Sequence, residues 1–248
     1  MERRSLFLGA FLAGGGALFA KSAGAGPSGS MTSSSETLSF APDVPLIPPA
    51  SGRIKVAFLI SDGFNLIDMV GPMQTFLQVP APSGKADEPG PFETFTVASS
   101  VEPIKGYQNL IVTPNYSLDA SPAPDIAVVG AQPRMTKAHI EYLRKVHADG
   151  KIVMSVCTGV VALAYSGLLD GLTVTTHHSF IEEYTKAYPK VTFVADKAYV
   201  HAAPLIFTAG GETSGFELAL HIVELYYGRK VAVETARSME YRGPAWQA

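Results

Sequence analysis

The single cysteine of the chain, Cys157, lies where a thiol could act as a nucleophile. The mostly apolar residues 152–156 predict a buried strand that leads directly into Cys157, and an apolar helix is predicted to begin at Gly159. So tight a strand-to-helix turn forces its apex residue into a sparsely populated backbone conformation and points the side chain out at the carboxyl edge of the sheet. Open α/β sheets bind ligands at that edge, so the position favours a functional thiol over the apolar filler that composition alone suggests.

A helix that begins beside Cys157 should also change the chemistry of the thiol. Its unpaired N–H groups and positive dipole lower the pKa of a nearby thiol from about 8.5 and can hold an oxyanion. With one cysteine, this sequence excludes an internal disulfide and a zinc site built on several thiolates. We therefore expect a reactive thiol with a lowered pKa.

The elements that must position Cys157 follow from the apolar pattern. From residue 53 onward, short apolar runs alternate with amphipathic stretches, which is typical of βαβ units around a mostly parallel sheet. Strands are predicted at 54–61, 92–99, 126–129, 152–156, 173–176, 191–195 and 205–209, and helices at 69–79, 137–148, 159–169, 180–187 and 214–227. A segment at 231–239 closes the fold, which we expect to be a single α/β domain over residues 53–248.

The first 25 residues have the composition of an export signal rather than of a folded element. Arg3-Arg4 precedes a weakly apolar stretch rich in Gly and Ala, and Ala23-Gly24-Ala25 makes a small-residue cleavage site. This pattern resembles a twin-arginine signal, with an ordinary secretory signal as the alternative. We expect residues 26–52, rich in Ser and Pro, to form a flexible linker. The predicted location is the periplasm or otherwise outside the cytoplasm, without a stable membrane anchor after cleavage.

Charge and motif content exclude several classes of partner. The net charge is -3, and no run of Lys and Arg follows the first few residues, so nucleic acid is not an expected partner. The glycines match neither a phosphate loop nor a dinucleotide fingerprint. His139, His147 and His221 are expected on helices as surface or satisfied core residues. No spacing of His, Asp and Glu indicates a metal, and we predict neither a metal nor a cofactor.

Several motifs, in order along the chain, resemble the ThiJ/PfpI superfamily of class I glutamine-amidotransferase-like folds. They are Leu66-Ile67-Asp68-Met69-Val70-Gly71-Pro72, Ser155-Val156-Cys157-Thr158-Gly159, Gly167-Leu168-Leu169-Asp170-Gly171, Thr175-Thr176-His177, Thr208-Ala209-Gly210-Gly211, Thr213-Ser214-Gly215 and Met239-Glu240-Tyr241. Within that superfamily the likeness is greatest to isonitrile hydratases and to the sensor domains of AraC-type regulators. The resemblance implies a three-layer, flavodoxin-like sandwich with a nucleophile elbow at Cys157.

The resemblance also implies catalytic roles for three residues. Cys157 would be the nucleophile, and Asp68 would lie beside it with a raised pKa, because a carboxylate and a thiolate resist coexisting in a desolvated cleft. The alternative is that Asp68 only caps a helix starting near Met69. Thr158 stands where proteases of the superfamily carry histidine, and a hydroxyl cannot replace that base, so a protease is disfavoured.

Substrate-binding or supporting roles are implied for His177, Gly159, Gly210 and Gly211. The glycines would let backbone pass close to the elbow. For His177, a structural role is as well supported as a catalytic one. His178 stands where the family more often has tryptophan, and Glu212 stands where hydratases tend to have an uncharged residue.

The resemblance leaves three functions open, each with a small-molecule substrate or ligand. The preferred one is a cysteine-dependent hydro-lyase that converts an isonitrile to an N-substituted formamide and needs no cofactor. A glyoxalase-like or stress-protective thiol enzyme acting on small dicarbonyls is the second. The third is a non-enzymatic periplasmic domain that binds or senses a ligand. A homodimer is expected by resemblance.

Overall fold

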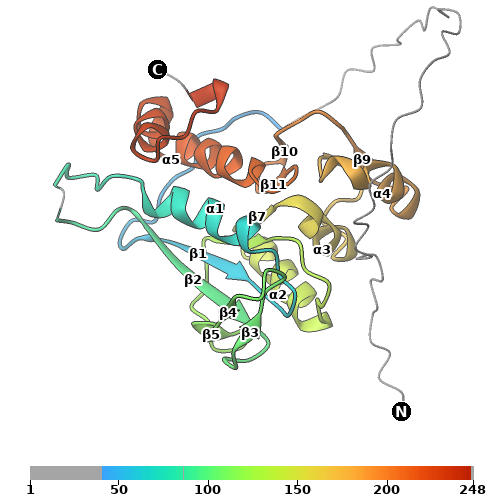
Figure 1. Ribbon diagram of the computed structural model, residues 1–248. Helices are drawn as coiled ribbons and strands as arrows, with labels where there is room; N and C mark the ends of the chain where they lie inside the picture. Colours follow the sequence, from blue (N-terminus) through green and yellow to red (C-terminus); the bar gives the residue numbers. More distant parts are fainter. Residues whose placement is uncertain (1–40, 86, 247–248) are drawn as a thin grey trace, which may run out of the picture.

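A seven-stranded sheet forms the centre of the protein, as seen in a computed structural model that describes residues 41–85 and 87–246 (Figure 1). The strand order is β10-β11-β7-β6-β1-β2-β5. All neighbouring strands are parallel except β10 and β11. The strands are β1 (Ile54–Leu59), β2 (Phe92–Ala98), β5 (Tyr116–Ser117), β6 (Ile126–Val129), β7 (Ile152–Ser155), β10 (Tyr199–Ala203) and β11 (Ile206–Ala209).

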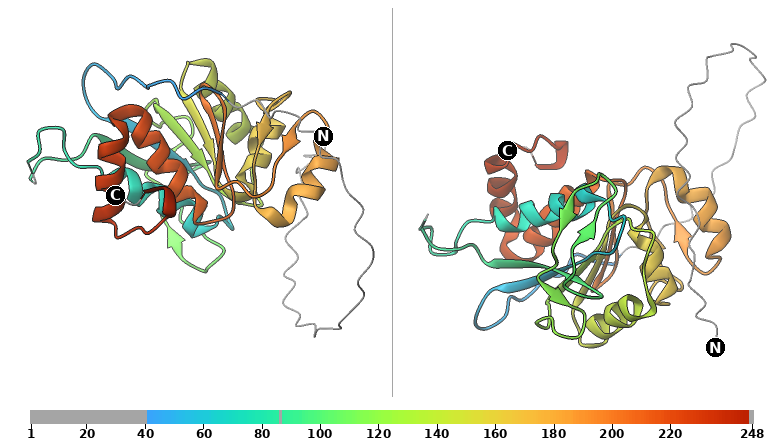
Figure 2. Two further views of the ribbon diagram at one scale, coloured as in Figure 1. Left: turned by 90° about the horizontal axis from the view of Figure 1, so that it is seen from above. Right: turned by 60° about the horizontal axis from the view of Figure 1, so that its bottom comes forward.

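Helices cover both faces of the sheet and complete three layers (Figures 1 and 2). The α-helices are α1 (Leu66–Leu77), α2 (Lys137–Ala148), α3 (Val160–Tyr165), α4 (Ile181–Ala187) and α5 (Ser214–Ser238). Helices α1 and α5 pack together on one face, where Phe58 and Met154 point, and α2 and α3 lie on the other, with Leu59 and Val153. Successive strand side chains point to opposite faces, so every residue of β6 and β7 is buried. The predicted mostly parallel, flavodoxin-like α/β sandwich is confirmed.

Shorter elements connect this framework. They are the antiparallel pair β3 (Ile104–Lys105) and β4 (Ile111–Val112), the parallel pair β8 (Thr173–Val174) and β9 (Thr192–Phe193), and the 3-10 turns η1 (Cys157–Gly159), η2 (His178–Phe180) and η3 (Pro244–Trp246). The apolar pattern did not predict β3, β4, β5 or β10, because the first three have only two residues each and β10 carries a histidine at its centre.

The largest differences from the predicted helices are at α1, α3 and α5. Helix α1 starts at Leu66, three residues before the predicted start, because the side chain of Asn65 caps it by accepting the Ile67 N–H at 3.3 Å. The predicted helix 159–169 ends at Tyr165, and Gly167 follows with a φ of 76°. The predicted segments 214–227 and 231–239 are joined in α5 across a kink at Gly228.

The N-terminal arm, residues 41–52, contains no helix or strand, but it contacts the body of the protein. The Ala41 N–H donates to the His201 carbonyl of β10 at 3.0 Å, and the Leu46 N–H donates to the Leu225 carbonyl of α5 at 2.8 Å. The predicted export signal and residues 26–40 of the predicted linker lie outside the described residues. None of the described helices has the length and apolar character that crossing a membrane requires.

Candidate functional site

The turn between β7 and η1 has the geometry of a nucleophile elbow. Cys157 has a φ of 56°, a left-handed conformation that is uncommon for residues other than glycine. Two hydrogen bonds hold the turn: the Cys157 N–H donates to the Gly210 carbonyl at 2.8 Å, and the Thr176 hydroxyl donates to the Cys157 carbonyl at 2.9 Å. The predicted elbow therefore forms, and β11 and the segment after β8 fix it from two sides.

Gly159 lets this turn pack directly against the end of β6. A Cβ atom at residue 159 would lie 2.2 Å from the Val129 carbonyl oxygen, a distance that no side chain can accept. The structure thus gives the expected supporting role of Gly159 a steric cause: the backbone of the elbow passes too close to the neighbouring strand for any other residue.

The thiol of Cys157 is almost fully enclosed, with 5% of the residue exposed. Burial, and to a smaller extent the nearby Asp68 carboxyl, raise the pKa of the Cys157 thiol to about 12. The backbone N–H groups of Glu212 and Thr158 bond to the sulfur and oppose that rise. The expectation of a lowered pKa is therefore wrong for the free protein. The loss of water outweighs the N–H groups and the dipole of a helix, α3, that has only six residues.

Asp68 supplies a buried carboxyl group beside this thiol. It lies in the first turn of α1 and is 0% exposed. Its Oδ2 accepts the Ala131 N–H at 2.8 Å, whereas Oδ1 has no hydrogen-bond partner among the described residues. Burial raises the pKa of Asp68 to about 7, the Ala131 N–H opposes the rise, and the charge of Glu212 adds to it. The alternative in which Asp68 merely caps the helix is wrong, because Asn65 is the cap.

Gly130, at the end of β6, makes room for that carboxyl group and was not singled out from the sequence. A Cβ atom on Gly130 would lie 2.6 Å from the Cβ atom of Asp68. The sequence held only a weak signal for this role, which is that Gly130 and Ala131 directly follow an apolar strand. We conclude that Gly130 fixes how closely Asp68 approaches the carboxyl edge of the sheet.

Thr158 and Tyr184 bring two hydroxyl groups to the same region. Thr158 is 8% exposed, and its side chain hydrogen-bonds to the Tyr184 phenol of α4. Burial is the main cause of a raised pKa of Tyr184, and the proximity of Cys157 contributes. Thr158 therefore connects the elbow to α4. Tyr184 was missed because a tyrosine on an amphipathic helix has the appearance of an ordinary core residue.

Glu212 contributes both a backbone N–H and the charge of its side chain to the site. It follows Gly211 with a φ of 39°, and this strained conformation turns its N–H toward the Cys157 sulfur. Its side chain is exposed, and its charge reaches both Asp68 and Cys157. The sequence alone gave no reason for this glutamate, because its role depends on a loop that only the fold brings to the elbow.

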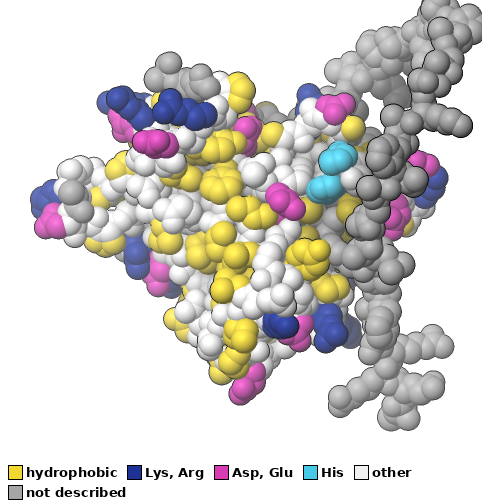
Figure 3. All heavy atoms as spheres, in the orientation of Figure 1, with side chains coloured by type: hydrophobic (Ala, Val, Ile, Leu, Met, Phe, Trp, Pro, Cys, Tyr) yellow, Lys and Arg dark blue, Asp and Glu magenta, His cyan; other side chains and the backbone are white. Residues whose placement is uncertain are grey.

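A cavity of about 430 Å³ adjoins the elbow, although Cys157, Thr158 and Asp68 are not among its lining residues. The elbow partners Thr176 and Glu212 are among its lining residues, together with His177, His178, Lys197 and others. Figure 3 shows histidine side chains on the surface near α4, next to an acidic side chain. The cavity offers charged and hydrogen-bonding groups at the carboxyl edge of the sheet, where a small polar ligand could bind.

His177 forms a wall of this cavity. Its Nδ1 accepts the Ser179 N–H at 3.2 Å, and its ring stacks on that of His178 with the ring centroids 4.5 Å apart. A Cβ atom on Gly211 would lie 2.6 Å from the His177 ring, and one on Gly210 would lie 3.2 Å from both the Lys197 carbonyl oxygen and the Ser214 hydroxyl. Burial lowers the pKa of His177, and the charge of Glu212 opposes this. These contacts fix the His177 ring at the cavity wall.

The sequence matches known proteins over most of its length. The model of the DJ-1/PfpI family matches residues 54–225. An HTH-type transcriptional regulator, GbdR of Pseudomonas aeruginosa, is 26% identical over 206 residues, which are 82% of this chain and 54% of the regulator. The chain thus spans about half the length of that relative. An isonitrile hydratase of Pseudomonas putida is 25% identical over 193 residues, 76% of this chain and 78% of the hydratase.

Solved structures agree on the fold. An AraC family transcriptional regulator from Pseudomonas putida has a TM-score of 0.64 and 17% identity, covering 75% of this chain and 99% of that one. A ThiJ/PfpI family protein from Pseudomonas syringae has a TM-score of 0.63 and 20% identity, covering 78% of each chain. At this identity the likeness establishes the architecture.

Proposed function

The chain belongs to the DJ-1/PfpI family, and from that premise we propose that it is a cysteine-dependent hydro-lyase that adds water to an isonitrile to give an N-substituted formamide. The observation that carries this proposal is the Asp68 carboxyl group, which is buried beside the Cys157 thiol with one oxygen unpartnered among the described residues. A pKa of about 7 lets this group both accept and deliver a proton near neutral pH. The similarity to an isonitrile hydratase supports the substrate class.

The first half of the proposed reaction attaches the substrate to the enzyme. Cys157 gives its proton to the Asp68 carboxylate, and its sulfur forms a bond to the terminal isonitrile carbon. Asp68 then delivers the proton to the same carbon, which leaves a thioimidate, R–N=CH–S, on the cysteine. The N–H groups of Glu212 and Thr158 stabilise the thiolate as its charge develops.

The second half releases the product. Water adds to the thioimidate carbon, and one of its protons passes through Asp68 to the nitrogen. The C–S bond then breaks, the hydroxyl proton returns to sulfur, and the carbon keeps the oxygen as the formamide carbonyl. The hydroxyl groups of Thr158 and Tyr184 lie next to the thiol and would orient the substrate or the water.

The experiment incubates the purified protein with an aliphatic isonitrile and measures formamide by mass spectrometry. Cys157→Ser should abolish turnover, and Asp68→Asn should lower kcat by roughly 10²- to 10⁴-fold, the usual contribution of a general acid or base. Asp170→Asn changes an exposed carboxylate paired with Lys190 and serves as the control. No formamide from several isonitriles would overturn the proposal, and lactate from methylglyoxal would favour a dicarbonyl substrate.

A ligand-binding or sensing domain is the second candidate. The similarity to GbdR over 82% of this chain favours it, as does a thiol that is protonated at neutral pH in the free protein. Such a domain should gain thermal stability from its ligand, and the gain should persist in Cys157→Ser without turnover. Ligand stabilisation that disappears with the thiol would instead favour covalent chemistry.

We further propose that the chain is exported, on the basis of Arg3-Arg4 and the apolar stretch that follows. Cell fractionation tests this proposal. The protein should be recovered outside the cytoplasm, and replacing both arginines with lysine should retain it inside. Export that is unaffected by this replacement would favour an ordinary secretory signal.

A further inference from the structure

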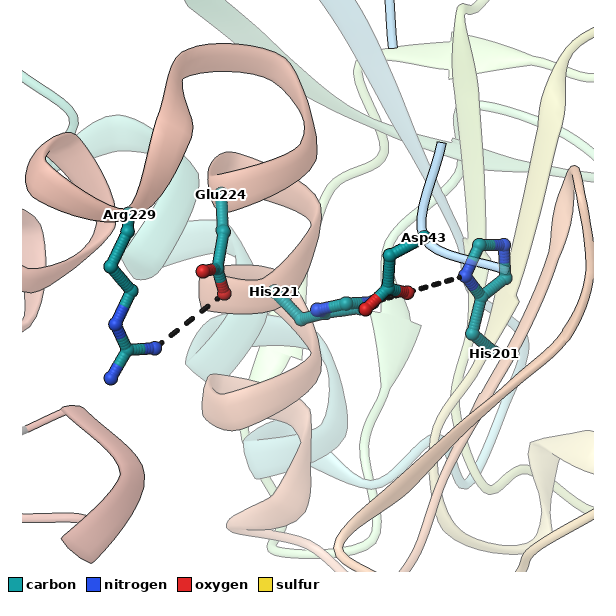
Figure 4. A network of polar contacts seen from close by, with 5 residues as sticks. All are labelled: Asp43, His201, His221, Glu224 and Arg229. Carbon is teal, nitrogen blue, oxygen red and sulfur yellow. Dashed lines mark hydrogen bonds and ion pairs between the residues drawn. The ribbon is translucent and has the colours of Figure 1, made fainter. Parts of the chain in front are cut away.

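The N-terminal arm brings a carboxylate to two buried histidines at the edge of the sheet, outside the Cys157 site. Asp43 lies in the arm, His201 at the centre of β10, and His221 on α5 (Figure 4). Asp43 Oδ1 is 3.0 Å from His201 Nδ1 and 3.3 Å from His221 Nε2. The three residues offer donor atoms that all lie within 4.8 Å of one another.

These separations are close to those in a metal centre. Zinc bonds of about 2.0–2.1 Å in a tetrahedral arrangement place ligand atoms roughly 3.3–3.4 Å apart. The two histidine side chains are only 6% and 5% exposed, whereas that of Asp43 is 64% exposed. The exposed carboxylate can therefore adjust to an ion while the imidazoles stay in place, and solvent can reach the ion from the Asp43 side.

His221 Nε2 supplies an independent indication of a missing partner. This atom is buried and makes no hydrogen bond within the described part of the chain, although it faces a carboxylate oxygen. A buried nitrogen without a hydrogen bond destabilises the folded protein. A cation between the nitrogen and the carboxylate would replace their 3.3 Å ion pair with two metal–ligand bonds.

Both imidazole rings are held in position by aromatic neighbours. Tyr199 stacks on His221 with ring centroids 4.8 Å apart, and Phe207 stacks on His201 at 4.2 Å. Rings fixed in this way lose little freedom when they bind an ion.

Two backbone hydrogen bonds hold the segment of the arm that carries Asp43. The Ala41 N–H bonds to the carbonyl of His201 itself, and the Leu46 N–H bonds to α5 at Leu225, so the arm is anchored on both sides of the carboxylate. The nearby carboxylate of Glu224 lies 3.5 Å from Arg229, and Figure 4 shows it directed toward that arginine. Glu224 is thus a neighbouring acid that does not face the cluster.

We propose that Asp43, His201 and His221 bind one zinc-class divalent cation that fastens the N-terminal arm to β10 and α5. Two imidazoles and one carboxylate suit Zn²⁺ and similar transition metals, whereas Mg²⁺ and Ca²⁺ prefer oxygen ligands. Three protein ligands leave a fourth position for water on the exposed side.

The test is a calorimetric titration of the full chain with Zn²⁺ after chelator treatment. A Cys157→Ser background removes the lone thiol as a competing ligand. We expect one Zn²⁺ per chain, a higher melting temperature with zinc, and at least tenfold weaker binding in Asp43→Asn. Asp43 is exposed, so this variant should fold, and Glu224→Gln is the matched control for a neighbouring acid.

Three results would overturn the proposal. The first is no zinc binding in the Cys157→Ser protein, even if Asp43→Asn lowers the melting temperature, because the cluster would then be only an ion pair. The second is equal affinity with and without Asp43. The third is binding that survives Asp43→Asn but is lost in His178→Ala, which would place the ion at the stacked His177 and His178 pair instead.

Discussion

Burial determines the protonation of both the Cys157 thiol and the neighbouring Asp68 carboxyl group. Burial raises the pKa of both groups, to about 7 for Asp68 and about 12 for Cys157. The free site therefore holds a protonated thiol next to a carboxyl that is close to half protonated at neutral pH. This protonation state favours a mechanism in which the thiol loses its proton as it attacks the substrate. It disfavours one in which the free protein already holds a thiolate.

Asp68 should make the stability of the protein depend on pH. Its pKa is raised from 3.8 to about 7 by folding, so the folded state holds this proton more strongly than the unfolded state. The stabilisation is complete below pH 4 and is lost as the pH rises to 7. Urea unfolding should show roughly 2–3 kcal/mol less stability at pH 8 than at pH 5 from this group. Asp68→Asn should remove that difference.

The control for this prediction is Asp170→Asn, which should unfold with the pH dependence of the parent protein because its carboxylate is exposed. If Asp68→Asn kept the full difference between pH 5 and pH 8, the carboxyl of Asp68 would not be the group that titrates.

The reactivity of Cys157 should increase when its neighbour loses its charge. Asp68 raises the pKa of the thiol, so Asp68→Asn should lower that pKa and speed alkylation by iodoacetamide at pH 8 about three- to tenfold. Burial, the larger cause, persists in the variant and limits the gain. The rate is read from mass spectra over time, with Asp170→Asn as the reference. An unchanged rate in Asp68→Asn would show that the carboxyl group does not influence the thiol, and a slower rate would show that Asp68 assists deprotonation of the thiol more than it raises the thiol pKa.

At the scale of the elements, two turns converge on one sulfur atom. The turn after β7 supplies Cys157 and the N–H of Thr158, and the loop between β11 and α5 supplies the N–H of Glu212. Both segments contain residues with positive φ, so the strain is concentrated where the thiol is held. The glycines beside them permit this approach.

The glycines of the two turns should differ in their tolerance of a side chain. A Cβ atom on Gly159 would meet a backbone oxygen at 2.2 Å, whereas one on Gly211 would meet the half-buried ring of His177 at 2.6 Å. A backbone atom in a strand is held in place by the hydrogen bonds of the sheet, whereas a side-chain ring at a cavity wall can shift. Gly159→Ala should therefore cost about 3 kcal/mol in urea unfolding and Gly211→Ala about 1 kcal/mol. The reverse order would mean that His177 is fixed more firmly than the end of β6.

At the scale of the molecule, the sheet edges differ in how they are covered. The arm donates one backbone hydrogen bond to β10, the edge strand next to β11, so this edge is partly protected. The arm also carries Asp43, so its docking and the proposed cation site depend on each other.

A homodimer remains a prediction from the family resemblance. Light scattering coupled to size-exclusion chromatography should give twice the mass of one chain at micromolar concentration. A mass equal to one chain would contradict the homodimer. The exposed apolar side chains of Tyr107, Leu110 and Ile111 near β4 would then not be explained by a dimer interface.

The sequence by itself determined the parts of this protein that depend on local pattern. Apolar runs and their period predicted β6 and α2 with correct bounds and most of the sheet, because strands and helices differ in the spacing of their buried residues. The elbow followed from a strand that meets a helix at Cys157. The family motifs identified Asp68 as its partner, although the structure places α1 three residues earlier and so makes Asp68 a member of the helix instead of its cap.

Only the tertiary structure decided what depends on desolvation and on contacts between distant segments. The pKa of Cys157 rises because the fold removes water from it, which no local pattern reports. Glu212 and Tyr184 reach the thiol from a loop and a helix far along the chain. Asp43, His201 and His221 come from an arm, a strand and a helix separated by up to 178 residues, so no spacing in the sequence could have indicated their cluster.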